Sequence, residues 1–256
     1  MRPKNSYKKE EFFKVFYERN LELTRLQVKN SVTYDVLIVH TINNLIDIAQ
    51  VINMLIKDLR EWYEIYAPEF SKAVKEHEMF VESIVKKSKE ELLINLGIKK
   101  DGSIGADLPE RDVSQIKVIG KAVIHLYTLK KQQESYLESL MSLRCPNLKE
   151  VAEIDIGARL LRHAGSLKNL MEMPASKIQL LGAEKALFRH MKSGSKPPKY
   201  GILFQHPLIQ KMEKKKQGKC ARALADKIAI AVKVDYFKGE FIGDKLRNGL
   251  EVRFGK

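Results

Sequence analysis

The pattern of apolar and polar positions predicts a mainly helical fold. Its clearest part lies between residues 35 and 66, where apolar positions alternate spacings of four and three over about four heptads. This predicted coiled-coil seam consists of Ile38, Ile42, Leu45, Ala49, Ile52, Ile56 and Leu59, followed by Tyr63 and Tyr66. A second stripe, made of Leu37, Ile48, Val51, Leu55 and Trp62, widens the apolar face, as suits a helix with more than one neighbour. Pro68 is expected to end this helix.

A second long helix is predicted between about Pro109 and Pro146. Its apolar stripe is interrupted by the polar residues Lys130 and Gln133, so the seam should be weaker there. The apolar positions on either side of that interruption are Ile116, Ile119, Val123, Leu126, Leu137 and Leu140. Two long helices joined by a compact insert predict an antiparallel coiled pair, whose wide face could take a partner helix or a second copy of the chain.

The first 30 residues predict one short amphipathic helix, with charged residues between its apolar positions. Those positions are Phe12, Phe13, Phe16, Tyr17 and Leu21. Two interpretations of this helix remain open. It covers part of the core, or it offers an aromatic docking surface to a partner because so short a segment has little core of its own to cover.

Charge divides the chain into two unequal parts. The whole chain has 46 Lys and Arg against 32 Asp and Glu, a formal net charge of +14, of which residues 147–256 carry +12. This step predicts a boundary near residue 147 and three parts: residues 1–30, 31–146 and 147–256. The basic part fits either a solvated lysine surface or a surface that binds RNA phosphates.

The sequence shows none of the usual signatures of an enzyme, such as a glycine-rich nucleotide motif, a P-loop or a zinc-binding pattern. Cys145 and Cys220 cannot form a disulfide framework and fit a reducing compartment. The N-terminus has no secretory signal, and no uncharged apolar run reaches the roughly 18–20 residues of a membrane span. We therefore expect a non-catalytic cytoplasmic protein that holds no metal or cofactor and contacts no membrane.

Basic side chains gather near two predicted helix ends and the loop SGSKPPKYG. They are Arg162, His163, Lys185, Arg189, Lys192, Lys196 and Lys199. Arginine and histidine stack on unpaired bases as well as contacting phosphates, which favours structured or single-stranded RNA over duplex DNA.

Residues 157–209 resemble the signature core of the Nop domain. The blocks HAGSL, PAS, LGAEKALF and PPKYG stand in the order and spacing of that family. Residues 220–237 resemble its closing helix and the two long helices resemble its coiled coil, so the resemblance covers roughly residues 30–256. The pattern is most similar to the archaeal Nop-domain core proteins of box C/D guide-RNA ribonucleoproteins. It implies long antiparallel coiled-coil helices followed by an all-helical Nop domain, with a short N-terminal segment.

The resemblance implies a scaffold with several partners. The Nop domain would bind a kink-turn box C/D guide RNA jointly with a kink-turn-binding protein of ribosomal type, and the coiled coil would pair with a second copy. The N-terminal segment would dock fibrillarin through Phe12, Phe16 and Tyr17. Fibrillarin, and not this chain, would bind S-adenosylmethionine and methylate ribose 2′-hydroxyls of rRNA and tRNA. The alternative is a splicing-type relative that clamps a kink-turn without a methyltransferase.

The resemblance also implies roles for single residues. The GAEK motif, Gly182 to Lys185, would lie near the RNA and its bound protein, and Ala186, Leu187, Phe188 and Arg189 match a loop at the end of the guide–substrate duplex, although Phe188 could equally belong to the core. Gln205 and His206 fall where relatives carry an RNA-contacting histidine, and either could take that role. Lys177 and Gln179 are candidates for phosphate contacts at a helix start. The predicted RNA-binding set is Arg162, His163, Lys177, Gln179, Glu184, Lys185, Arg189, Lys192, Lys196, Lys199, Gln205 and His206.

Overall fold

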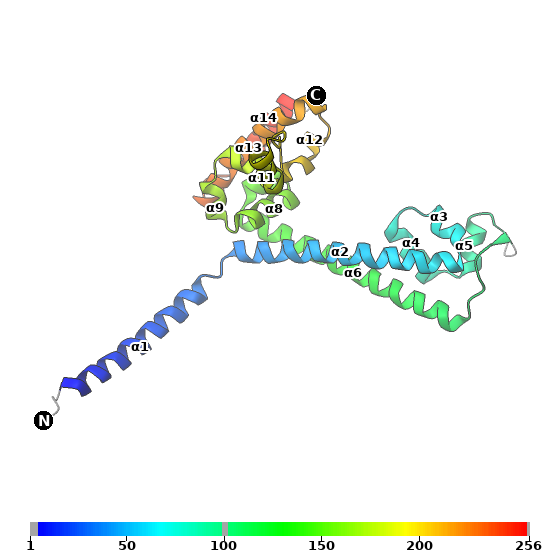
Figure 1. The fold of residues 1–256 in the computed structure, drawn as a ribbon, viewed down its shortest axis with the longest axis horizontal. Coiled ribbons are helices and arrows are strands. Elements are labelled where there is room, and N and C mark those ends of the chain that lie inside the picture. The colour runs from blue at the N-terminus through cyan, green and yellow to red at the C-terminus, as the bar shows by residue number, and fades with distance from the viewer. Residues whose placement is uncertain (1–4, 99–101, 255–256) are drawn as a thin grey trace.

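A computed structural model describes residues 5–98 and 102–254, and these residues form helices and loops without strands (Figure 1). The predicted mainly helical class is therefore confirmed. The first half of the chain contains α1 (Asn5–Asn30), α2 (Tyr34–Tyr66), α3 (Pro68–Ala73), α4 (His77–Lys86), α5 (Lys89–Asn95) and α6 (Glu110–Arg144). The second half contains α7 (Pro146–Ala152), α8 (Ile154–Ala164), α9 (Leu167–Glu172), α10 (Ala175–Leu180), α11 (Glu184–Ser193), the 3-10 helix η2 (Ile202–Gln205), α12 (Pro207–Gln210), α13 (Lys214–Tyr236) and α14 (Gly243–Phe254).

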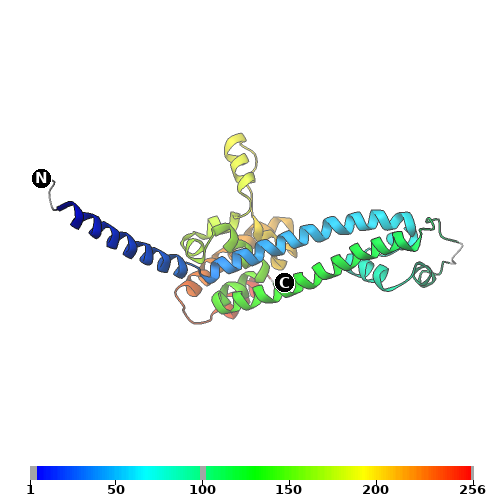
Figure 2. The same ribbon diagram turned by 90° about the horizontal axis from the view of Figure 1, so that it is seen from below.

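The two long helices α2 and α6 lie side by side and run in opposite directions (Figures 1 and 2). The early α2 residues Ile38 and Ile42 share a buried cluster with the late α6 residue Leu137, which fixes the antiparallel order. The predicted α2 seam positions are buried except Ala49 and Tyr66, which are half-buried, and on α6 Ile119 and Leu126 are also half-buried. The prolines mark the predicted limits correctly, since α2 ends before Pro68 and α6 lies between Pro109 and Pro146.

The buried apolar side chains form two clusters that divide the paired helices. One cluster includes Leu45 and Leu137 and continues into the C-terminal helices other than α11, whereas the other includes Ile52 and Val123 and continues into α3–α5. No apolar side chain of α6 between Val123 and Leu137 is fully buried. A cavity of about 720 Å³, which Ala49 lines, and another of about 240 Å³ flank this interval. The polar interruption at Lys130 and Gln133 is the physical reason, because both side chains line these cavities rather than filling the seam.

Helix α2 is long and apolar enough, by length and composition alone, to cross a membrane. Its apolar seam is instead buried against α6 and the neighbouring short helices, and the polar residues Asn43, Asn44 and Asp47 interrupt its outer surface. These features are those of an amphipathic helix with one buried face.

The short helices α3–α5 pack on the far end of the pair around an aromatic cluster. Tyr63 of α2 meets Phe70 and Phe80 edge to face, with ring centroids 6.1 and 5.5 Å away. The guanidinium of Arg60 lies 4.2 Å from the centre of the Phe80 ring and donates hydrogen bonds to backbone carbonyls of the α3–α4 connection, including that of Val74. The arginine thus satisfies carbonyls that the turn would leave unpaired.

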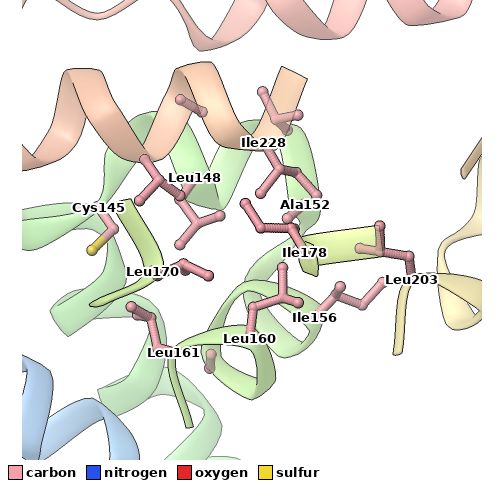
Figure 3. Close-up of a cluster of buried hydrophobic side chains, with 14 of the residues drawn as sticks. Cys145, Leu148, Ala152, Ile156, Leu160, Leu161, Leu170, Ile178, Leu203 and Ile228 are labelled. Carbon is pink, nitrogen blue, oxygen red and sulfur yellow. The ribbon is translucent and has the colours of Figure 1, made fainter. Parts of the chain in front are cut away.

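The helices of the C-terminal half other than α11 pack around the larger cluster, part of which is drawn in Figure 3. Two buried aspartates tie this half together. Asp235 of α13 accepts hydrogen bonds from the backbone N–H groups of Asn147 and Leu148 at the start of α7. Asp35 of α2 accepts one from Leu167 N–H, and thereby joins the coiled pair to α9.

Helix α1 extends away from the rest of the molecule (Figures 1 and 2). Every described side chain on it, from residue 11 to residue 29, is exposed. Phe12, Phe16 and Tyr17 are 64%, 57% and 66% exposed. The interpretation in which this helix covers part of the core is therefore wrong for this conformation, because its aromatic face contacts no other element.

Candidate nucleic-acid interface

Helix α11 projects from the C-terminal half as an isolated arm (Figure 2, in yellow). We call residues 184–193 the α11 arm. None of its side chains is buried. The prediction of a loop at Ala186–Arg189 is wrong, because these residues form the middle of helix α11. Phe188 is 62% exposed, which excludes its assignment to the core.

The base of the α11 arm is held by backbone pairing between the segments that enter and leave it. Gly201 N–H donates to the carbonyl of Gln179 at 2.9 Å, and Ile202 N–H donates to that of Leu181 at 2.8 Å. A Cβ atom at Gly201 would lie 1.9 Å from the Leu181 carbonyl oxygen, so only glycine fits. Gly182 has φ of +83°, a left-handed conformation that glycine adopts without strain.

Glu184 of the GAEK motif is engaged at the same base. Its Oε1 accepts a hydrogen bond of 2.7 Å from Gly182 N–H and lies 3.5 Å from Nδ1 of His163 at the end of α8. Partial burial raises the pKa of Glu184, but these hydrogen bonds and His163 outweigh it and hold the pKa below its ordinary value. The carboxylate thus links the HAGSL and GAEK motifs and orients the first turn of the arm.

A strongly basic groove lies beside the arm, with a volume of about 490 Å³. It is lined by Gln179, Lys196, Pro197, Pro198, Lys199, Lys215, Gly218, Lys219 and Arg222. Five of these residues are cationic and none is acidic, so the groove offers phosphate groups a favourable potential without a neighbouring carboxylate to repel them. We call this feature the basic groove.

The sequence prediction found only part of the basic groove. It included Gln179, Lys196 and Lys199 but missed Lys215, Lys219 and Arg222 of α13. Those three positions have the spacing i, i+4 and i+7, which places them on one helix face. That spacing was the available signal, and a helix prediction that began at Lys214 would have revealed it.

Two residues of the predicted RNA-binding set are buried and hold backbone segments in place. The side-chain amide of Gln179 is buried and donates to the carbonyl of Lys199, which holds the groove loop against α10. His206 is buried, and its Nδ1 accepts a hydrogen bond from Leu208 N–H at the start of α12. Burial lowers the pKa of His206 and keeps its ring neutral. Of the two alternatives at this position, Gln205 is the exposed one.

The remaining predicted positions are exposed but do not converge on one point. Lys185, Arg189 and Lys192 lie on the α11 arm, while Arg162 lies on α8 and Lys177 on α10, outside the lining of the basic groove. Within residues 5–98 and 102–254 no group of three or more histidine, cysteine or acidic side chains could hold a metal ion. Both cysteines are buried, and burial raises the pKa of each thiol.

Comparisons with known proteins agree with this arrangement. Residues 44–256 match the family model described as "Nop: snoRNA binding domain, fibrillarin". A NOP5 family protein of Methanocaldococcus jannaschii is 38% identical over 97% of this chain, and nucleolar protein 56 of Schizosaccharomyces pombe is 35% identical over 90%. The chain spans 63% and 51% of the lengths of these two relatives.

A solved structure gives the same result. One chain of a crystal structure of a fibrillarin/Nop5p complex has 28% sequence identity, and the match covers 96% of this chain and 79% of that one with a TM-score of 0.57. The residues that match the family model include most of the coiled pair, the α11 arm and the basic groove. The chain belongs to the Nop domain family and is homologous to the NOP5, Nop56 and Nop58 proteins.

Proposed function

We propose that this chain is a non-catalytic scaffold that binds kink-turn box C/D guide RNA jointly with a kink-turn-binding protein of ribosomal type. The observation that carries the proposal is the basic groove, in which five cations and no carboxylate line one depression beside an exposed arm. The snoRNA-binding description of the matching family supports it. The complete assembly would direct ribose 2′-O-methylation of rRNA and tRNA, with the chemistry supplied by a partner enzyme and its S-adenosylmethionine.

The groove and the arm would contribute differently to RNA binding. Cations that neutralise phosphates release counterions, so binding should weaken steeply with salt, and the slope counts the phosphate contacts. Lys185 and Arg189 on the α11 arm would reach RNA or protein that lies beyond the body of the domain. Specificity for the kink-turn would come from the composite surface that the second protein completes, because phosphate contacts alone carry no sequence information.

A gel-shift titration with and without the kink-turn-binding protein tests joint recognition. The chain should bind kink-turn RNA tightly only when that protein is present, and equal affinity in both titrations would contradict the proposal. Replacing Lys219 or Arg222 by alanine should weaken the ternary complex by roughly 1–3 kcal/mol for each charged hydrogen bond that the substitution removes. Lys121→Ala, an exposed change on the coiled coil, is the matched control and should leave RNA affinity unchanged.

The exposed aromatic face of α1 supports fibrillarin docking. Most of the stability of a helix in a protein comes from packing of its apolar face, so the exposed face of Phe12, Phe16 and Tyr17 gains stability when a partner covers it. Alanine at all three positions should abolish capture of fibrillarin by the full chain, whereas Val28→Ala on the same helix should not. Full capture of fibrillarin by the triple variant would show that the docking surface lies elsewhere. Failure of the wild-type chain to capture fibrillarin would favour the splicing-type alternative.

The outer stripe of α2 supports self-association through the coiled coil. Val51 and Trp62 remain more than a third exposed after α6 has packed, and Met54 and Ile65 beside them are each 58% exposed. Apolar residues in one row on a helix are expected to meet a second apolar surface. Light scattering should report a dimer for the wild-type chain and a shift toward monomer for Met54→Glu; a monomeric wild-type chain would contradict this part of the proposal.

A further inference from the structure

Two aromatic rings stack face to face in the segment that follows Lys199 of the basic groove. The rings of Tyr200 and Phe204 have centroids 4.7 Å apart and planes inclined by 10°. Tyr200 is half-buried and packs against the large apolar cluster, while Phe204 is 39% exposed. Phe204 therefore rests on a supported ring and keeps part of its own surface open to solvent.

The pair is held rigidly from beneath. The Tyr200 hydroxyl donates to Oε1 of the Gln217 amide at 2.9 Å, and the Gln217 amide nitrogen donates in turn to the carbonyl of Met212. Leu203, which precedes Phe204 in η2, is completely buried and lies in the core beside Ile178 (Figure 3). The backbone that carries Phe204 is thus anchored, and the ring is positioned before any ligand arrives.

The aromatic pair is close in the chain to residues that line the basic groove. Tyr200 follows Lys199 in the chain, and its partner Gln217 precedes Gly218; Lys199 and Gly218 both line the basic groove. The Lys199 side chain also passes close to Gly218, about 3.8 Å from where a Cβ would stand. Tyr200 and its partner Gln217 are therefore joined in the chain to residues of the groove wall, whose cationic side chains suit phosphates.

We propose that Phe204, supported by Tyr200, is a stacking platform for one unpaired base of an RNA strand whose phosphates lie in the basic groove. Aromatic faces next to cationic grooves bind single-stranded nucleic acid in this way, because every base has a π face and its backbone is anionic. Paired bases hide their faces inside the duplex, so the platform takes an unpaired nucleotide. The exposed Gln205 beside it offers an amide to the edge of that base.

Two other exposed aromatic residues of this half lack this combination. Phe237 is 71% exposed at the end of α13, but it meets its neighbour Tyr236 edge to face, and no residue next to it in the chain lines the basic groove. Phe188 projects on the α11 arm without a supporting ring among the described residues. The platform rests on the proposed RNA-binding function and deepens it by naming the class of nucleotide that is bound.

The experiment uses the full chain with the kink-turn-binding protein and two kink-turn RNAs. One RNA is fully paired outside the kink, and the other carries a short single-stranded extension labelled with 2-aminopurine. Phe204→Ala should weaken binding of the extended RNA roughly 5- to 150-fold and leave binding of the paired RNA unchanged. Phe204→Trp should keep the affinity and the quenching of 2-aminopurine that stacking produces. Phe237→Ala is the matched control and should behave as the wild type.

The outcomes separate this proposal from the function on which it rests. Tight binding of both RNAs by Phe204→Ala, with quenching retained, would overturn the stacking platform while leaving kink-turn recognition intact. An equal loss on both RNAs would also overturn it, because Phe204 would then contact the duplex or the second protein. Wild-type complexes that bind neither RNA would refute both proposals together.

Discussion

Replacing Asp235 by alanine should strongly destabilise the C-terminal half. The Asp235 carboxylate is buried and accepts three hydrogen bonds, from the N–H groups of Asn147 and Leu148 and from the side-chain amide of Asn147, at 3.1, 2.8 and 2.8 Å. These bonds satisfy donors at the start of α7 that have no partner within the helix. The Asn147 side chain also accepts from Ile242 N–H at 2.7 Å, so one carboxylate organises three segments.

The magnitude follows from the donors that Asp235→Ala leaves unpaired. A buried donor without an acceptor costs roughly 1–3 kcal/mol. Burial raises the pKa of Asp235, because the cost of holding the charge away from water exceeds what the three hydrogen bonds return to the carboxylate. The costs of three unpaired donors at one site do not add fully, so we expect a loss of about 3–5 kcal/mol in the free energy of unfolding.

Urea unfolding followed by far-ultraviolet circular dichroism measures this loss. Asp226→Ala, an exposed change on the same helix, is the matched control and should stay within about 0.5 kcal/mol of the wild type. If Asp235→Ala were as stable as Asp226→Ala, the assignment of this carboxylate as the acceptor that organises α7 would be refuted.

Three further changes have definite expected results. Gly201→Ala should disorder the base of the α11 arm and reduce RNA binding, measured by gel shift, because its Cβ would overlap the Leu181 carbonyl; wild-type affinity would contradict this. Gly249→Ala has open space around it in α14 and should raise the thermal midpoint, through a helix-propensity gain of up to about 1 kcal/mol. Burial lowers the pKa of His206 in the folded state. The free energy of unfolding should therefore decrease as pH falls from the unfolded-state pKa of about 6.5 through the lower folded-state pKa. His206→Asn should lack that acid sensitivity in urea titrations at a series of pH values; an equal dependence on pH would refute the role of the ring.

The long helices were predictable because their signals are local. The seam from Ile38 to Leu59 repeats every three or four residues, and Pro68 and Pro146 mark helix limits that follow from the proline ring itself. Even the gap in the seam could be anticipated, since Lys130 and Gln133 break the apolar pattern. The exposure of α1 could not be predicted, because an amphipathic pattern does not say whether the surface that covers it belongs to the same chain.

The candidate site was predictable only in part, because its residues meet through tertiary packing. Motif blocks located Lys196 and Lys199, but Lys215 and Arg222 join them only once α13 has packed against the loop. Burial of His206 likewise depends on surrounding elements, and a polar residue within a motif looks the same in the sequence whether it caps a helix or faces solvent.

The division of the apolar core between Leu45 and Ile52 has a consequence for unfolding. Since no fully buried apolar side chain of α6 bridges the interval from Val123 to Leu137, the two halves should melt as separate cooperative units. RNA bound at the groove stabilises only the native state of the unit that contains it. Calorimetry should therefore show two unfolding transitions. Guide RNA and its partner protein should raise the midpoint temperature of one transition and leave that of the other unchanged.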